Sequence, residues 1–203
     1  MFLDSKQETL VIMIIKPQDT LIALKYCSIQ LQMQGDQINK TLIEVGLSPN
    51  YGIRDLAEIL GVSSSEISKA TKRLEKARLV TVRDKAMVIT RNLFEWLVHG
   101  MRYYCPLKTE GFGRAVATGW NCPLLQSSMV PPKPGWGWAN SKGDVEAELI
   151  APFHVSVPIA ARHDPWLYQA LSLVDVLRGG KPRELVMAET ELSVLMGLKN
   201  GQS

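Results

Sequence analysis

The chain has 203 residues, of which 46% are hydrophobic and 21% charged, and its formal net charge is +3. This composition is typical of a globular protein with one large domain or two small ones, and it argues against a disordered chain. The three cysteines are widely spaced, which argues against a disulfide framework or a zinc ribbon, so we expect reduced thiols.

The first residues carry neither an export signal nor a membrane span. MFLDSKQE lacks the order of basic, apolar and small residues that precedes signal cleavage, and the apolar run at residues 10–15 is too short to cross a bilayer. We therefore expect a cytoplasmic protein without a membrane partner. The run itself is either a strand or the lead-in to a helix.

The first helix of the core is predicted after Pro17. Apolar residues then recur at helical spacing, at Leu21, Leu24, Tyr26, Ile29 and Leu31. A connecting helix is predicted at residues 38–45, followed by a loop to Gly52.

The stretch from Ile53 to Lys72 has the spacing of two short helices joined by a tight turn. Gly61 lies at the turn, where a left-handed backbone suits glycine, and Ala57 is small where the two helices approach each other. The positions expected to face the core are Leu56, Ala57, Leu60, Val62, Ile67, Ala70 and Leu74.

The second of these helices is predicted over residues 64–78, with Ser63 and Glu66 as a capping box. Its outward face is rich in hydroxyl and cationic groups, which suit base edges and phosphate oxygens. We interpret it as a recognition helix that reads the major groove. Its expected DNA-binding residues are Ser64, Ser65, Ser68, Lys69, Lys72, Arg73 and Lys76.

A short β-hairpin is predicted next, at residues 80–90, with Arg83 and Lys85 at its tip. The order of two helices and a ribbon indicates a winged helix-turn-helix, whose wing lies against the DNA backbone or the minor groove. Between Ser63 and Arg91 there are eight basic residues and three acidic ones, an excess of five cations. This local excess is the electrostatic pattern expected of a surface that binds a polyanion.

The segment IRDLAEILGVSSSEISKATKRLEKARLV resembles the core of MarR-like winged-helix transcriptional regulators, in which LA..LG.S...IS.A...LE..GL is the usual pattern. The resemblance covers about residues 20–106 and implies DNA binding, with the groove-facing and wing roles at the positions already named. These sequences commonly place a glycine where this chain has Arg78, so we expect the recognition helix to end less abruptly here. A winged helix can also serve as a protein-docking module.

A further helix is predicted at residues 92–104, with Asn92 as its N-cap. Its expected inward residues are Phe94, Leu97, Val98 and Met101.

From Pro106 to Pro158 the many glycines and prolines predict an ordered but irregular arm without long regular elements. We interpret Trp120, Trp136 and Trp138 as packing anchors of this arm rather than a ligand pocket. Arg102, Arg114 and Arg162 are expected to bind its carbonyl groups.

The last forty residues predict a helical hairpin. Asp164 is expected as an N-cap and Pro165 as the first helical residue, and Gly179-Gly180 should end this helix. A second helix begins near Pro182. Both helices are expected to be amphipathic, with an apolar face that the arm or another subunit covers.

No pattern points to catalysis. The histidines and cysteines lack metal-ligand spacing, and neither a Walker motif nor a nucleophile elbow is present. We therefore predict that the protein is not an enzyme, with no catalytic, cofactor-binding or metal residues and no cofactor.

The predicted fold is mainly α with a small β-wing: a winged helix-turn-helix (residues 1–105), an irregular Pro/Gly-rich arm (106–158) and a C-terminal helical hairpin (159–203). The leading hypothesis is a homodimeric, sequence-specific regulator of transcription that binds double-stranded DNA. The alternative is an antitoxin-like or adaptor module whose C-terminal half binds a protein partner.

Overall fold

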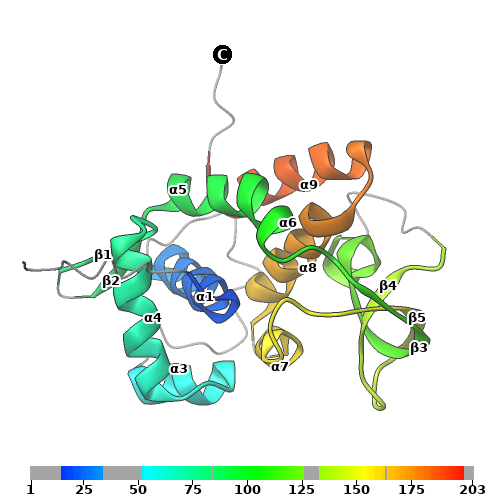
Figure 1. The fold of residues 1–203 in the computed structure, drawn as a ribbon, viewed down its shortest axis with the longest axis horizontal. Coiled ribbons are helices and arrows are strands. Elements are labelled where there is room, and N and C mark those ends of the chain that lie inside the picture. Colours follow the sequence, from blue (N-terminus) through cyan, green and yellow to red (C-terminus); the bar gives the residue numbers. More distant parts are fainter. Residues whose placement is uncertain (1–14, 34–51, 84, 126–132, 163, 199–203) are drawn as a thin grey trace, which may run out of the picture.

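The computed structural model describes residues 15–33, 52–83, 85–125, 133–162 and 164–198 (Figure 1). The elements predicted at residues 10–15 and 38–45 lie outside these ranges, apart from Ile15. The described part is mainly helical, with a two-stranded hairpin and a three-stranded sheet. Within it, no helix has both the length and the apolar character needed to cross a membrane.

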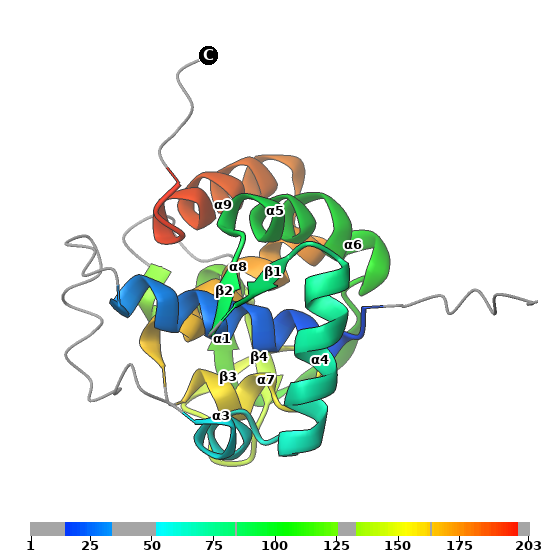
Figure 2. The same ribbon diagram turned by 90° about the vertical axis from the view of Figure 1, so that its left-hand side faces the viewer.

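Helix α1 (Pro17–Met33) lies at the centre of the fold, as predicted for the first core helix (Figures 1 and 2). Every residue from Asp19 to Lys25 is buried. Because a buried polar group is costly without a partner, the polar side chains of α1 bond to several different elements. Trp96 Nε1 donates to Thr20 Oγ1 at 3.1 Å, and the side chain of Gln30 pairs with the backbone of Val88.

A buried ion pair joins α1 to the C-terminal half. Lys25 Nζ lies 2.9 Å from Asp164 Oδ2, and the two side chains are 0% and 1% exposed. Ser28 Oγ donates to the same carboxylate oxygen at 2.6 Å. Asp164 Oδ1 accepts from the backbone N–H of Leu167, which confirms Asp164 as the N-cap of α8 (Pro165–Gly179).

Helix α4 (Ser64–Lys76) and strand β2 (Ala86–Val88) pack on α1, whereas α3 (Ile53–Leu60) packs on α4 and β1 (Val80–Val82) pairs with β2. They match the predicted helix pair and hairpin, although β2 ends before Thr90. The next predicted helix is also present. It consists of α5 (Thr90–Glu95), a π-helical turn (Trp96–Gly100) and α6 (Met101–Tyr104).

The inward face of this helix agrees with the prediction, whereas its N-cap does not. The predicted inward residues Phe94, Leu97, Val98 and Met101 are buried. The predicted N-cap is wrong, because the helix begins at Thr90 and Asn92 Nδ2 instead donates to the carbonyl oxygen of Arg78 at 2.7 Å. Asn92 therefore binds the end of α4 rather than the start of its own helix.

The predicted irregular arm is wrong, because three strands of this segment form a small sheet. Strand β3 (Thr109–Thr118) is ten residues long and runs antiparallel to both β4 (Trp136–Ala139) and β5 (Val145–Ile150). Short parallel pairing of β4 with β5 closes the sheet on itself. Short helix α7 (Val157–Ala161) follows.

The prediction failed because the glycines of this segment do not break strands. They allow neighbouring parts of the chain to approach each other closely. A Cβ atom at Gly137 would lie 2.4 Å from the Cβ atom of Ala115, and one at Gly143 would lie 2.1 Å from the carbonyl oxygen of Ala115. Gly137 therefore lets β4 approach the side chain of Ala115 closely, and Gly143, in the turn before β5, lets the chain approach the backbone of Ala115. Trp120 and Trp138 are buried, which confirms them as packing anchors, and Trp136 is half-buried.

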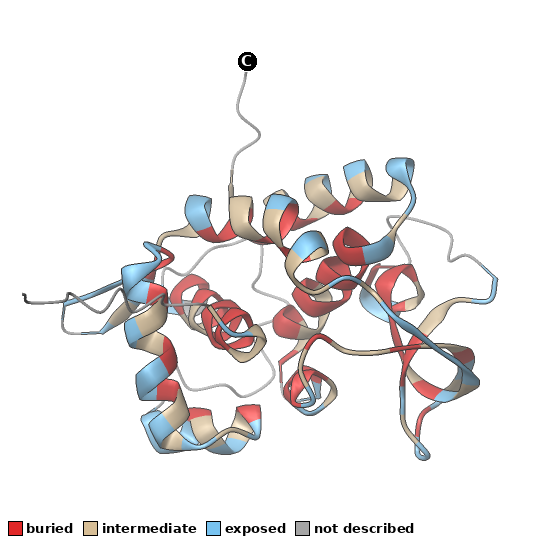
Figure 3. Cartoon of the chain, viewed as in Figure 1, coloured by how far each residue is buried: buried red, intermediate tan, exposed pale blue. Residues whose placement is uncertain are grey.

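The C-terminal hairpin of α8 and α9 (Pro182–Leu195) is confirmed. The expectation that both helices are amphipathic is wrong for α8, because every residue from Ala170 to Arg178 is buried (Figure 3). Contacts with α6, α7, α9 and the 3₁₀ turn at Gly119–Asn121 surround it. Helix α8 is thus a second buried helix of the core.

Polar residues of α8 connect it to the sheet. Asp175 accepts hydrogen bonds from Thr118 Oγ1, Trp138 Nε1 and Arg178 Nη1 at 2.9, 2.8 and 2.6 Å. Arg178 also donates to the carbonyl oxygens of Cys105 and Ala151. Sequence reasoning did not identify this network, which lies in a helix whose other buried residues are apolar apart from Ser172.

We expect Lys25→Met to lower the free energy of unfolding by about 3 to 5 kcal/mol, because it leaves Asp164 buried without its cation. Urea unfolding followed by circular dichroism measures the change. The matched control is Lys108→Met, at an exposed lysine, which should stay within about 0.5 kcal/mol of wild type. Equal stability of the two variants would contradict the role of this ion pair.

Candidate nucleic-acid interface

The turn between α3 and α4 has the predicted geometry. Gly61 has φ of 61°, in the left-handed region, and the backbone N–H of Val62 donates to the carbonyl oxygen of Ala57 at 3.0 Å. This is a common way to close a helix, and only glycine adopts it without cost. Leu56 and Leu60 of α3 and Ile67 and Leu74 of α4 are buried in the hydrophobic core.

Only half of the predicted capping box at the start of α4 is present. Ser63 Oγ accepts from the backbone N–H of Glu66 at 3.3 Å. The carboxylate of Glu66 turns instead to Gln18 Nε2 of α1, and this hydrogen bond lowers the pKa of Glu66. Glu66 thus ties α4 to α1.

The outward side of α4 is exposed, as predicted, apart from two residues. Ser65, Ser68, Lys69, Lys72 and Lys76 are exposed, whereas Ser64 is half-buried. We call the line of Ser65, Lys69, Lys72 and Lys76 the crest of α4, because these residues lie opposite the buried Ile67, Ala70 and Leu74 on the helix.

Arg73 is the second exception, and its predicted place on the outward face is wrong. Its side chain is 12% exposed, and its guanidinium binds the fully buried carboxylate of Asp19 through two hydrogen bonds of 2.7 Å. This two-bond geometry is characteristic of arginine. The contact raises the pKa of Arg73 and fixes the middle of α4 against the start of α1.

A third polar contact joins the same two helices. Thr71 Oγ1 donates to the carbonyl oxygen of Ile67, so the hydroxyl of Tyr26 is the donor in the 2.8 Å hydrogen bond between Tyr26 Oη and Thr71 Oγ1. Burial raises the pKa of Tyr26. Gln18, Asp19 and Tyr26 together set the position of α4 on α1.

The expected gradual end of α4 is wrong. Arg78 adopts φ of 58° in the left-handed region, and the backbone N–H of Leu79 donates to the carbonyl oxygen of Leu74 at 3.0 Å. The helix therefore ends at Lys76 with the geometry that a glycine usually provides. Asn92, which binds the carbonyl oxygen of Arg78, helps to hold this backbone.

The sharp end of α4 directs the chain into the hairpin. β1 and β2 pair antiparallel, with Val80 opposite Val88 and Val82 opposite Ala86. Arg83 and Lys85 are exposed at the tip, on either side of residue 84. Both predicted wing cations are therefore accessible.

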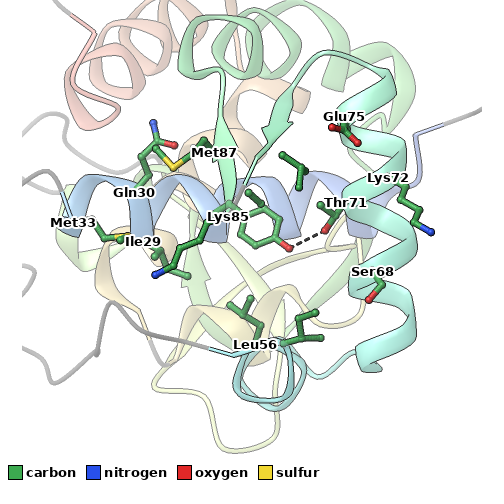
Figure 4. A pocket seen from close by; sticks show the side chains of 14 residues that line it. Ile29, Gln30, Met33, Leu56, Ser68, Thr71, Lys72, Glu75, Lys85 and Met87 are labelled. Carbon is green, nitrogen blue, oxygen red and sulfur yellow. Dashed lines mark hydrogen bonds between the residues drawn. The ribbon is translucent and has the colours of Figure 1, made fainter.

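A pocket of about 470 Å³ lies between α1, α3, α4 and the hairpin (Figure 4). Most of its lining is apolar, including Ile29 and Met87, and the ring of Tyr26 also lines it. Polar side chains from α1, α4 and the hairpin complete the lining: Gln30, Ser68, Thr71, Lys72, Glu75 and Lys85.

The turn between α3 and α4 also rests on the C-terminal half. Ser156 Oγ donates to the carbonyl oxygen of Gly61 at 3.2 Å, and Ile159 of α7 lies beside the same glycine. His154 Nδ1 accepts from the backbone N–H of Ser156. Sequence reasoning did not predict this contact, because nothing local marks two segments so far apart as neighbours.

The remaining arginines and the cysteines that the sequence singled out lie outside the α4 surface. Arg114 Nε donates to the carbonyl oxygen of Gly143, as expected for an arginine of that segment, whereas Arg102 stacks on Tyr103 and Arg162 is exposed. The three cysteines are free thiols, and burial raises the pKa of Cys27 to about 12. In the described ranges, no cluster of three histidine, cysteine or acidic side chains could hold a metal ion.

Comparison of the chain with models of known protein families, with curated proteins and with solved structures finds no match.

We expect Arg73→Ala to lower the free energy of unfolding by about 3 kcal/mol or more, because Asp19 stays buried without its partner. Arg73→Lys should lie between this variant and wild type, since lysine cannot form both hydrogen bonds in the same plane. Urea unfolding tests both variants against Lys72→Ala, an exposed neighbour expected within about 0.5 kcal/mol of wild type. An Arg73→Ala protein as stable as Lys72→Ala would refute the structural role.

His154 predicts a dependence of stability on pH. Burial lowers its pKa from the ordinary value, so the unfolded chain takes up this proton at higher pH than the folded chain does. Stability should consequently decrease as the pH falls through about 6.5, the ordinary histidine value. Urea unfolding at several pH values should show a weaker dependence for His154→Gln than for wild type.

Proposed function

We propose that the chain is a cytoplasmic, sequence-specific regulator of transcription that binds double-stranded DNA through a winged helix-turn-helix. In this proposal α3 and α4 are the helix pair, α4 is the recognition helix, and the β1–β2 hairpin is the wing. The residues proposed to contact DNA are Ser64, Ser65, Ser68, Lys69, Lys72, Lys76, Arg83 and Lys85. Arg73 is not among them.

The observation that carries the proposal is the exposed cationic crest of α4 beside a hairpin with cations at its tip. Lys69, Lys72 and Lys76 leave one side of the helix within reach of phosphates. A helix used only to bury an apolar face has no need of this arrangement, although lysines on a helix are often merely solvated. Here the lysines lie on the side of α4 that a helix-turn-helix would turn toward the major groove.

The start of α4 suits contacts with bases. Ser65 is exposed in its first turn, where backbone N–H groups also point toward any approaching anion. Ser68 Oγ donates to the carbonyl oxygen of Ser64, which leaves its lone pairs free to accept from a base amino group. In this proposal the serines at the start of α4 contact bases, and the lysines along the crest contact phosphates.

A single recognition helix contacts too few base pairs to select one site in a genome, so the proposal includes a homodimer on two half-sites. The outer side of α9 is the candidate surface, because Val186 and Val194 are 65% and 46% exposed there and lie two turns apart. The same exposed valines support a second candidate function, an antitoxin-like or adaptor module that binds another protein through its C-terminal half.

We expect Lys69→Ala with Lys72→Ala to weaken binding to a duplex from the region upstream of the chain's own gene. The slope of log affinity against log salt should fall by about two, because each substitution removes one cation that neutralises a phosphate. Fluorescence anisotropy at several salt concentrations measures both quantities. Lys108→Ala with Lys142→Ala, at two exposed lysines far from α4, is the control. An unchanged slope in the first variant would remove α4 from the interface.

A further inference from the structure

Glu75 is an exposed carboxylate near the end of α4, one turn beyond Lys72. It lies on the flank of the helix that faces the hairpin, not on the crest. Figure 4 shows it at the pocket between α4 and the hairpin, whose lining it shares with Ser68, Lys72 and Lys85. A negative charge therefore lies among the cations of the surface proposed to meet DNA.

The fold does not account for this carboxylate. Asp19 and Glu66 bind Arg73 and Gln18, and Asp55 caps α3 through the backbone N–H of Gly52. Among the described residues, the carboxylate of Glu75 has no hydrogen bond or ion pair. It also lies near the C-terminus of α4, where the helix dipole disfavours a negative charge. Its stabilising contribution to the folded chain is thus small or negative.

In the proposed DNA complex, the position of Glu75 determines which part of the duplex its carboxylate approaches. A helix in the major groove and a ribbon against the neighbouring minor groove have one sugar-phosphate strand between them, because such a strand separates the two grooves. In the proposed complex, the space between α4 and the hairpin faces this strand. Lys72 and Lys85 are attracted by its phosphates, and Glu75 is repelled by them.

We propose that Glu75 is an electrostatic brake, which weakens contacts with the DNA backbone so that base contacts of α4 decide where the protein stays bound. The proposal rests on the proposed function. Phosphate contacts are the same at every sequence, whereas base contacts differ. A repulsive charge at the phosphate strand therefore lowers affinity for all DNA and leaves a larger share of the binding energy to sequence.

The test uses the full chain and a fluorescent duplex of random sequence, about three helical turns long. Glu75→Gln should bind this duplex roughly fivefold more tightly than wild type, as expected for removal of one nearby like charge in water. The slope of log affinity against log salt should rise by about one, since one cation is no longer offset. Glu75→Asp keeps the charge and should bind like wild type.

Glu110→Gln is the matched control, because it removes an exposed carboxylate from β3, far from α4, with the same change in net charge. If it tightens binding as much as Glu75→Gln does, the effect is one of net charge and the brake is refuted. If wild type binds and Glu75→Gln binds equally or more weakly, the brake is refuted while DNA binding stands. If wild type does not bind the duplex even at low salt, the proposed function fails and the brake fails with it.

Discussion

Helix α1 is buried along most of its length and yet carries polar residues on several sides, and each of these must find a partner within the protein. Asp19 and Tyr26 bond to α4, Lys25 and Ser28 bond to Asp164 at the start of α8, and Gln30 bonds to β2. Because these bonds leave α1 in different directions, together they hold α4, α8 and the hairpin in their positions around it. This requirement fixes where the crest of α4 stands.

Helix α8 is also buried and also carries polar side chains that need partners, here in the C-terminal half. Asp175 and Arg178 bring together α8, the sheet and the segment after α6, through side-chain and carbonyl contacts. Burying these groups is costly unless all of them are bonded. The sheet is therefore attached to the core by polar bonds as well as by Trp120 and Trp138. Contacts of this kind cross both domain boundaries that the sequence suggested.

The elements that were predicted correctly are those marked by sequence signals within a few residues. Helical periodicity, the glycine at position 61 and the cap at Asp164 each act within a few residues, so α1, α3, α4, α8 and α9 were predictable, as was the exposure of Ser65, Lys69 and Lys72. Long-range contacts accounted for the errors. Periodicity places Arg73 near the outside of α4, and only the buried Asp19 of another helix turns it inward. The sheet was missed because its close backbone contacts need glycine, which in sequence looks like a breaker.

The hydrogen bond from Ser156 to Gly61 joins residues 95 positions apart, and the pair of Lys25 with Asp164 spans 139 positions. Synthesis delivers the N-terminal half first. The helix pair thus leaves the ribosome before the segments that hold its turn and its central helix have been made. A nascent or truncated chain carries the cationic crest without these supports, so correct presentation of α4 depends on synthesis of the chain at least as far as Asp164.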